Sequence, residues 1–241
     1  MNQARVRMLV EVFYDVQGTR LAATNRVRAA VSAGLSADLA REMTDWIDLR
    51  MDRQEAELKA LVMAEIKQEP LWQNWLKGVK GVGPCIAGGL MAWAGDCSNF
   101  DTVSKLWAWS GLHVLDGHAP RRERGVRANW NPVMRTLAWK ASKSFVLSGR
   151  GYRALYDAEK VRLRTLHPEP EPCDPPRKRK DGGVLMRFTD GHIDAMARRK
   201  VAKVFFAHYW QMARASAGLP TREVYVIEKL GHGSVIPIVR E

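Results

Sequence analysis

The stretch Leu76-Lys77-Gly78-Val79-Lys80-Gly81-Val82-Gly83-Pro84-Cys85-Ile86-Ala87 stands between two apolar segments with helical spacing. Two glycines flank one apolar residue, Val82, and the small residue Ala87 follows four positions after the second glycine. Glycine suits a hairpin because it adopts backbone angles that a Cβ disfavours, and because its backbone can approach a phosphate closely. The pattern therefore predicts a helix–hairpin–helix.

Such a hairpin has a direct way to bind nucleic acid. The free N–H groups at the start of the helix after Gly83 would hold a phosphate oxygen, helped by the helix dipole. Such contacts read the nucleic-acid backbone and not the base sequence. The predicted binding residues here are Lys77, Lys80, Gly81, Val82, Gly83 and Pro84, with Val82 anchoring the hairpin in the core. The alternative is an ordinary tight turn between packed helices.

The net charge of +12 is unevenly distributed along the 241 residues. Residues 1–70 carry a net charge of −1, residues 71–168 carry +9, and the remaining residues carry +4. A near-neutral segment attached to a basic one is typical of an assembly or spacer segment followed by a segment that binds a polyanion.

The most basic loop lies between Gly111 and Asn131. It contains Arg121, Arg122, Arg124 and Arg127 within seven positions, followed by Trp130. The arginines can clamp phosphates and the indole can offer a stacking surface, so all five are predicted to bind nucleic acid. The alternative is a solvated loop with Trp130 packed as a lid on the core.

Apolar residues recur at steps of three and four over most of the chain, which predicts an all-α fold. The expected helices cover residues 4–16, 19–33, 36–68, 71–79, 84–94, 102–110, 132–145, 150–166 and 191–215, with a break at Gly18 and a cap at Ser36. The proline-rich run 168–180 is expected to be neither helix nor strand, and the last 20 residues to form short strands or an extended arm.

The 36–68 helix has an apolar stripe that it cannot bury alone, so an antiparallel hairpin or a dimeric coiled coil is expected. Its other face carries charges that include Glu55. The predicted domains are a helical spacer and assembly segment (1–70), a helix–hairpin–helix domain (71–166), a surface excursion (167–190), and a helix with an extended tail (191–241). A homo-oligomer through residues 36–68 follows.

Several classes of protein are disfavoured by the composition. No run of about 18 apolar residues exists, so no membrane span is expected, and the N-terminus resembles a helix more than a signal peptide. Three cysteines without paired short spacing do not predict a zinc site. The acidic and histidine residues around His113 and in Asp190-Gly191-His192-Ile193-Asp194 favour turns and caps over a metal site. We expect no cofactor, and a cytoplasmic, nucleoid-associated protein.

The order of these elements resembles the C-terminal module of the insertion-sequence transposases of the "IS one-ten" class, which are guided by a bridge RNA. The resemblance rests on the hairpin, on Asn99-Phe100-Asp101 through Gly111-Leu112, on the basic loop and on Val133-Met134-Arg135-Thr136-Leu137. Arg20 to Val31 and Arg198-Arg199-Lys200-Val201-Ala202 also resemble that family. The resemblance implies DNA as a partner, a structured RNA as a second candidate partner, and an origin in a mobile element.

Two departures from the family bear on catalysis. Relatives begin with a RuvC-like domain, for which we expect no room here. Their transposase module is thought to use a serine in a Ser-Gly pair, and the matching pair here is Asp116-Gly117. A carboxylate cannot form a stable phosphodiester link to DNA, so we expect DNA binding without strand transfer. Ser110 is the candidate for a displaced nucleophile, although a serine at a helix end more often caps backbone groups.

Four alternatives remain open. An active transposase would use Ser110, and a nuclease would use Mg²⁺ with carboxylates such as Asp96, Asp101 and Asp116. A helix–hairpin–helix DNA glycosylase would place its catalytic aspartate at Asp101, 18 residues after Gly83, beside an aromatic pocket. A protein–protein adaptor would bind no DNA at all.

Overall fold

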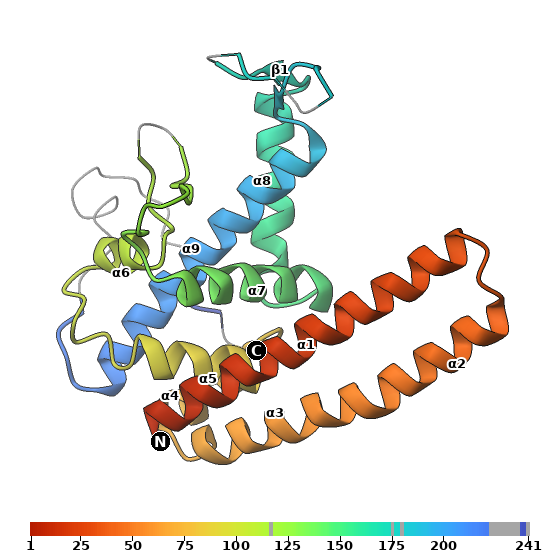
Figure 1. Cartoon of the computed structure of the whole chain (residues 1–241). Helices are drawn as coiled ribbons and strands as arrows, with labels where there is room; N and C mark the ends of the chain where they lie inside the picture. The colour runs from red at the N-terminus through yellow and green to blue at the C-terminus, as the bar shows by residue number, and fades with distance from the viewer. Residues whose placement is uncertain (116–117, 175, 179–180, 222–236, 240–241) are drawn as a thin grey trace. The chain divides into compact units, whose positions relative to one another are not determined.

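A computed structural model describes residues 1–115, 118–174, 176–178, 181–221 and 237–239. The chain forms two compact units, one made of Met1–Asn74 with Gly83–Gly95, and the other of Trp75–Val82 with Asp96–Glu241. Both are built mainly of helices, which confirms the predicted all-α class (Figure 1). No helix in the described ranges is long and apolar enough to cross a membrane.

The first unit is a long helical hairpin joined by a shorter helix. Its elements are α1 (Gln3–Ser32), α2 (Ala37–Ile47), the π-helix η1 (Asp48–Asp52), α3 (Arg53–Ile66), α4 (Pro70–Asn74) and α5 (Pro84–Trp93). α1 runs antiparallel to α2 and α3, and α5 packs against α1 and α3. Of the two expected arrangements of the 36–68 segment, the antiparallel hairpin is therefore present within one chain.

The hairpin is held by an apolar core at its N-terminal end. Val6 and Val10 of α1 and Val62 and Ile66 of α3 are fully buried. A Cβ added to Gly88 of α5 would lie 2.6 Å from Val62 Cγ1 and 3.2 Å from Val6 Cγ1. Gly88 therefore lets α5 approach both helices more closely than any side chain would allow.

Three details of the first unit differ from the sequence predictions. α1 continues through Gly18, where a break was expected, because the helix on both sides is held by contacts to α3. The predicted 36–68 helix begins at the Ser36 cap as expected, but it contains the π-helical turn η1. The predicted helix also ends earlier, at Ile66, and Pro70 is the first residue of α4, where a missing N–H costs nothing.

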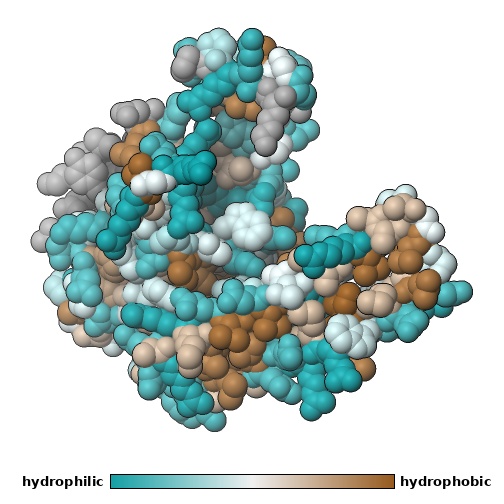
Figure 2. Space-filling model, viewed as in Figure 1, coloured by the Kyte–Doolittle hydropathy of each residue, from teal (hydrophilic) through white to brown (hydrophobic). Residues whose placement is uncertain are grey.

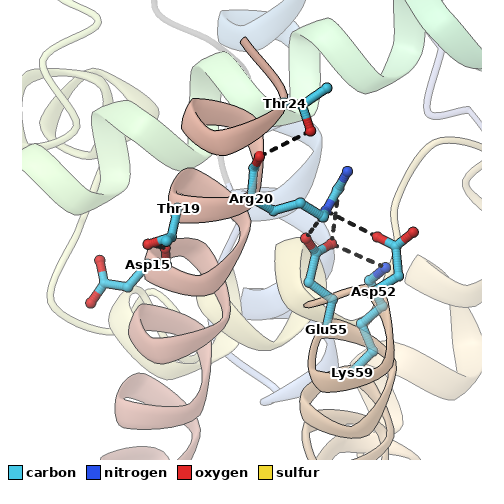
Figure 3. Close-up of polar contacts among 7 residues, drawn as sticks. All are labelled: Asp15, Thr19, Arg20, Thr24, Asp52, Glu55 and Lys59. Atoms are coloured by element: carbon cyan, nitrogen blue, oxygen red, sulfur yellow. Dashed lines mark hydrogen bonds and ion pairs between the residues drawn. The ribbon is translucent and has the colours of Figure 1, made fainter. Parts of the chain in front are cut away.

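An ion-pair network holds the middle of the hairpin (Figure 3). Arg20 Nε of α1 donates to Glu55 Oε1 at 2.6 Å and lies 2.9 Å from Asp52 Oδ1, while Lys59 Nζ lies 3.9 Å from Glu55 Oε2. The hydrogen bond to Glu55 raises the pKa of Arg20. Glu55 is only 3% exposed, so its predicted place on the solvated face is wrong: it is the buried acceptor that pairs the two helices.

The second unit is arranged around one long helix. Its elements are the 3₁₀ turn η2 (Leu76–Gly78), α6 (Val103–Trp109), α7 (Pro132–Ser148), α8 (Arg153–Leu166), strands β1 (Glu171–Pro172) and β2 (Met186–Arg187), and α9 (Asp190–Ser216). α9 contacts α6, α7 and α8. Its core is aromatic and includes Phe145, Tyr152, Phe205, Tyr209 and Trp210. Trp210 Nε1 donates to the Phe100 carbonyl at 2.7 Å, which satisfies the buried indole.

The proline-rich run contains a strand, contrary to expectation. Glu171 and Pro172 pair antiparallel with Arg187 and Met186. A two-residue ladder tolerates a proline because a pair this short needs no N–H from it, and the next residue, Cys173, donates to the Leu185 carbonyl at 3.0 Å. Most of the predicted C-terminal arm, including Tyr225-Val226-Ile227, lies outside the described residues.

Candidate nucleic-acid interface

The segment before the predicted hairpin turn is less regular than the single helix expected there. In place of one helix over 71–79, α4 ends at Asn74 and η2 forms a single 3₁₀ turn. Trp75, with φ −146° and ψ −64°, leaves helical geometry between them. Val82 N–H donates to the Val79 carbonyl at 3.0 Å and closes the turn. Gly83 is then the N-cap residue of α5, with Pro84 in its first turn.

The two hairpin glycines have different structural demands. Gly81 has φ +93°, and a Cβ there would lie 2.9 Å from Phe145 Cδ1 and 3.2 Å from Ser148 Oγ. The fold therefore requires glycine at position 81. Gly83 has φ −87°, and a Cβ there would meet nothing within 4 Å. The fold tolerates any residue at position 83, and no side chain caps the free N–H groups of α5 there.

Basic side chains surround this turn. Lys77 and Lys80 are exposed, while Val82 is 7% exposed and occupies the core as predicted. The loop after α7 packs directly on the turn, because a Cβ at Gly151 would lie 2.8 Å from the Lys80 carbonyl oxygen. That loop adds the exposed Arg150.

The basic loop presents its charge to solvent. Arg121, Arg122, Arg124 and Arg127 are all exposed. Trp130 is buried, with the Arg135 guanidinium 5.2 Å from its ring centre and with Gly111 so close that a Cβ there would lie 2.7 Å from Trp130 Cδ1. Trp130 therefore packs on the core, as the alternative interpretation predicted. The Arg135 guanidinium and the Gly111 backbone both lie close to its ring.

A hollow of about 290 Å³ lies between α7 and α9, with Leu112 and Ala119 also in its lining. Its basic lining comes from Arg135 of α7 and from His192, Arg198 and Arg199 of α9, and its apolar lining includes Trp139. The α7 residues 135, 138, 139 and 142 recur at helical spacing, as do 192, 195, 199 and 202 of α9, so each helix contributes one face.

Three basic side chains in or beside this hollow lack acidic partners among the described residues, whereas Arg198 pairs with Asp194. Arg135 Nη1 donates to the Pro120 carbonyl at 2.7 Å, Arg199 donates to the His113 carbonyl, and the Lys203 ammonium nearby lies 4.2 Å from the Trp107 ring centre. Burial lowers the pKa of all three, and the pKa of Arg199 falls further because Arg135 is close. Among the described residues, no carboxylate pairs with any of the three.

His192 completes the basic lining. Burial lowers its pKa, and the nearby positive charges of Arg187 and Arg121 and the neighbouring His167 lower it further. Its Nδ1 accepts a hydrogen bond from the Phe188 N–H at 3.0 Å.

Residues 73–157 match the family model described as Transposase IS116/IS110/IS902 family. The match covers about a third of the chain and includes the hairpin, the basic loop, α6 and α7. A search of the curated proteins found no match. The segment that carries the predicted interface is thus similar to a module of mobile-element transposases.

The transposase similarity directs attention to Asp116 and Ser110. Asp116 lies outside the described residues. Ser110 is fully buried, and its Oγ has no hydrogen-bond partner in the described part of the chain. The expectation that this hydroxyl caps the helix end is therefore wrong, because the side chain faces the core.

The other candidate carboxylates are on the surface. Asp101 is exposed and pairs with Lys105 one turn away, and the hollow does not include it. Asp96 accepts from the Ser98 N–H at 2.9 Å, and its hydrogen bonds to Ser98 lower its pKa. In the described ranges no three His, Cys, Asp or Glu side chains gather in a way that could hold a metal ion.

Sequence reasoning missed the hollow. Arg135 and Arg199 were noticed only as part of the family resemblance and not as site residues. One signal could have found them: each arginine stands on a helix face whose other positions are small or apolar, such as Ala138 and Ala202.

Proposed function

We propose that this chain binds the phosphate backbone of DNA through the 76–84 hairpin and the 121–127 loop, as a module related to the Transposase IS116/IS110/IS902 family. The proposal rests mainly on Gly83, a position at which packing does not require glycine. Because glycine has no side chain, the free N–H groups at the start of α5 remain uncapped, a few residues after the exposed Lys77 and Lys80. The net charge of +9 over residues 71–168 supports the same conclusion.

A pair of substitutions at Gly83 tests the proposal. In Gly83→Asp the new carboxylate caps α5 where a phosphate oxygen would bind, and Gly83→Asn provides a neutral cap of the same shape. Both should fold with the stability of the wild type or slightly above. The aspartate variant should bind duplex DNA at least about tenfold more weakly than the asparagine variant, because its charge repels phosphate. Equal affinity of both variants and the wild type would remove the hairpin from the interface.

Gly81→Ala serves as the control for folding. It adds a side chain at φ +93° and against Phe145, so it should lower the free energy of unfolding by roughly 2–3 kcal/mol. A loss of DNA binding in this variant would therefore report on the fold and not on the contact with DNA.

We propose further that the chain lacks strand-transfer chemistry of its own, since Ser110 is buried and Asp116 occupies the position of the family's serine. Incubating the same proteins with supercoiled and branched DNA, with and without magnesium, should give neither nicks nor a covalent adduct. An adduct that disappears in Ser110→Ala would contradict this and indicate an active recombinase. A structured RNA should be included as a second ligand in the binding experiments. If the chain binds DNA, we expect it to be associated with the nucleoid.

Self-association through α2 and η1 completes the proposal. Leu39, Met43, Trp46 and Leu49 recur at steps of three and four and are 48–70% exposed, and hydrophobic residues gather over the α1–α3 hairpin in Figure 2. Burying such a stripe against a second copy would stabilise a dimer. Light scattering at tens of micromolar should give a mass above 27.2 kDa, and Trp46→Glu should restore the monomer. A wild type that is monomeric at this concentration would contradict the proposal.

A further inference from the structure

The hollow between α7 and α9 contains basic side chains that no described carboxylate neutralises. In the described part of the chain, Arg135, Arg199 and Lys203 have carbonyl oxygens or aromatic rings as neighbours, and no carboxylate. Partly buried cations are costly unless a counter-charge accompanies them. Since no described carboxylate pairs with these three side chains, we expect their counter-charge to come from a ligand.

Two buried polar atoms beside the same hollow also lack partners. Arg198 Nε and His113 Nδ1 are buried without a hydrogen-bond partner among the described residues. Arg198 lines the hollow, and the His113 carbonyl accepts from Arg199. Buried polar groups in folded proteins are almost always hydrogen-bonded. Although Nη2 of Arg198 pairs with Asp194, its Nε–H is unsatisfied next to two cations without a described acidic partner, which points to an absent acceptor.

The size and lining of the hollow limit what the acceptor is. A volume of about 290 Å³ is at the lower end for ligand sites and fits one small group, not a duplex. Guanidinium groups bind phosphate through parallel N–H···O bonds. Trp139, which is 46% exposed, gives the hollow an aromatic face on which one base can stack.

We propose that this hollow binds one nucleotide of a nucleic-acid strand, with its phosphate on Arg135 and Arg199 and its base on Trp139. The proposal rests on the proposed DNA role, but it concerns a different ligand from the hairpin: a single-stranded segment or a strand end, where a base is free to stack.

The test compares Arg199→Gln with Lys200→Gln, which removes the same charge from the neighbouring exposed position of α9. The probes are tetrathymidylate with a 5′-phosphate, tetrathymidylate without it, and inorganic phosphate. Arg199→Gln should bind the phosphorylated strand at least about tenfold more weakly than the wild type, and Lys200→Gln should stay within about twofold. Trp139→Ala should weaken both strands and leave the affinity for inorganic phosphate unchanged.

The probes also separate a terminal phosphate from an internal one. A preference for the phosphorylated strand assigns the site to strand ends, and equal affinity assigns it to internal phosphates. If the wild type binds neither strand at low salt, or if Arg199→Gln and Lys200→Gln behave alike, the proposal is overturned.

Thermal unfolding without ligand separates a binding role from a structural one. An arginine kept for a ligand can be neutralised without loss, so the unfolding midpoint of Arg199→Gln should equal or exceed that of the wild type. A lower midpoint would show that Arg199 supports the fold through His113, and would overturn the proposal. Duplex binding by Arg199→Gln should persist while Gly83→Asp loses it, so failure of the hollow and failure of the hairpin remain distinguishable.

Discussion

Arg20 of the first compact unit and the pair Arg135 and Arg199 of the second have opposite surroundings. In the first unit, Arg20 lies between Glu55 and Asp52, and its pKa is raised. In the second, Arg135 and Arg199 contact carbonyl oxygens, have no acidic partner among the described residues, and have lowered pKa values. The first arrangement uses charge to fix the register of two helices. The second leaves charge without an acidic partner among the described residues, which agrees with the proposed binding of a polyanion.

The largest expected effect comes from breaking the paired arrangement. Glu55→Ala leaves Arg20 without its main acceptor inside the hairpin, so the free energy of unfolding should fall by about 3 kcal/mol. Glu57→Ala is the matched control, because its pair with Arg53 is exposed and is worth no more than about 0.5 kcal/mol. Urea denaturation measures both. Similar losses in the two variants would mean that the buried pair has no special role.

A smaller effect of opposite sign is expected from the unpaired arrangement. Arg135→Met substitutes an unbranched apolar side chain for a partly buried charge that no described carboxylate balances, and it removes the guanidinium contact with the Trp130 ring. The free energy of unfolding should stay unchanged or rise by up to about 1 kcal/mol. A clear loss of stability in the same urea experiment would show that Arg135 serves the fold, and the contrast between the two units would disappear.

Local rules explain why so much of the helical fold could be predicted. Ser36 and Asn131 cap their helices as side-chain acceptors, and Pro132 stands in a first turn, so these boundaries follow from neighbouring residues alone. The predictions failed where contacts with residues distant in the sequence determine the local backbone structure. Gly18 stays helical because α3 supports α1, and the predicted 71–79 helix is interrupted at Trp75, whose ring packs on Phe205 far along the chain.

For the candidate site, too, the features set by neighbouring residues could be predicted and those set by tertiary packing could not. The exposed lysines and loop arginines are read from consecutive residues, and the structure places them on the surface. The hollow could not be predicted, because Arg135 and Arg199 come together only when α7 packs on α9, 64 positions apart in the sequence. The burial of Glu55 and Ser110 likewise depends on which helix covers each residue, and periodicity does not give that information.

The salt dependence of DNA binding tests the central claim most directly. The affinity of the wild type for two unrelated 20-base-pair duplexes would be measured by fluorescence anisotropy between 50 and 300 mM salt. If the exposed and unpaired basic side chains bind phosphates, the logarithm of the association constant should fall linearly with the logarithm of salt concentration. The slope should be about −4 or steeper, since each neutralised phosphate contributes about 0.9, and it should be the same for both sequences. A slope shallower than about −1, or no binding at 50 mM salt, would contradict the account.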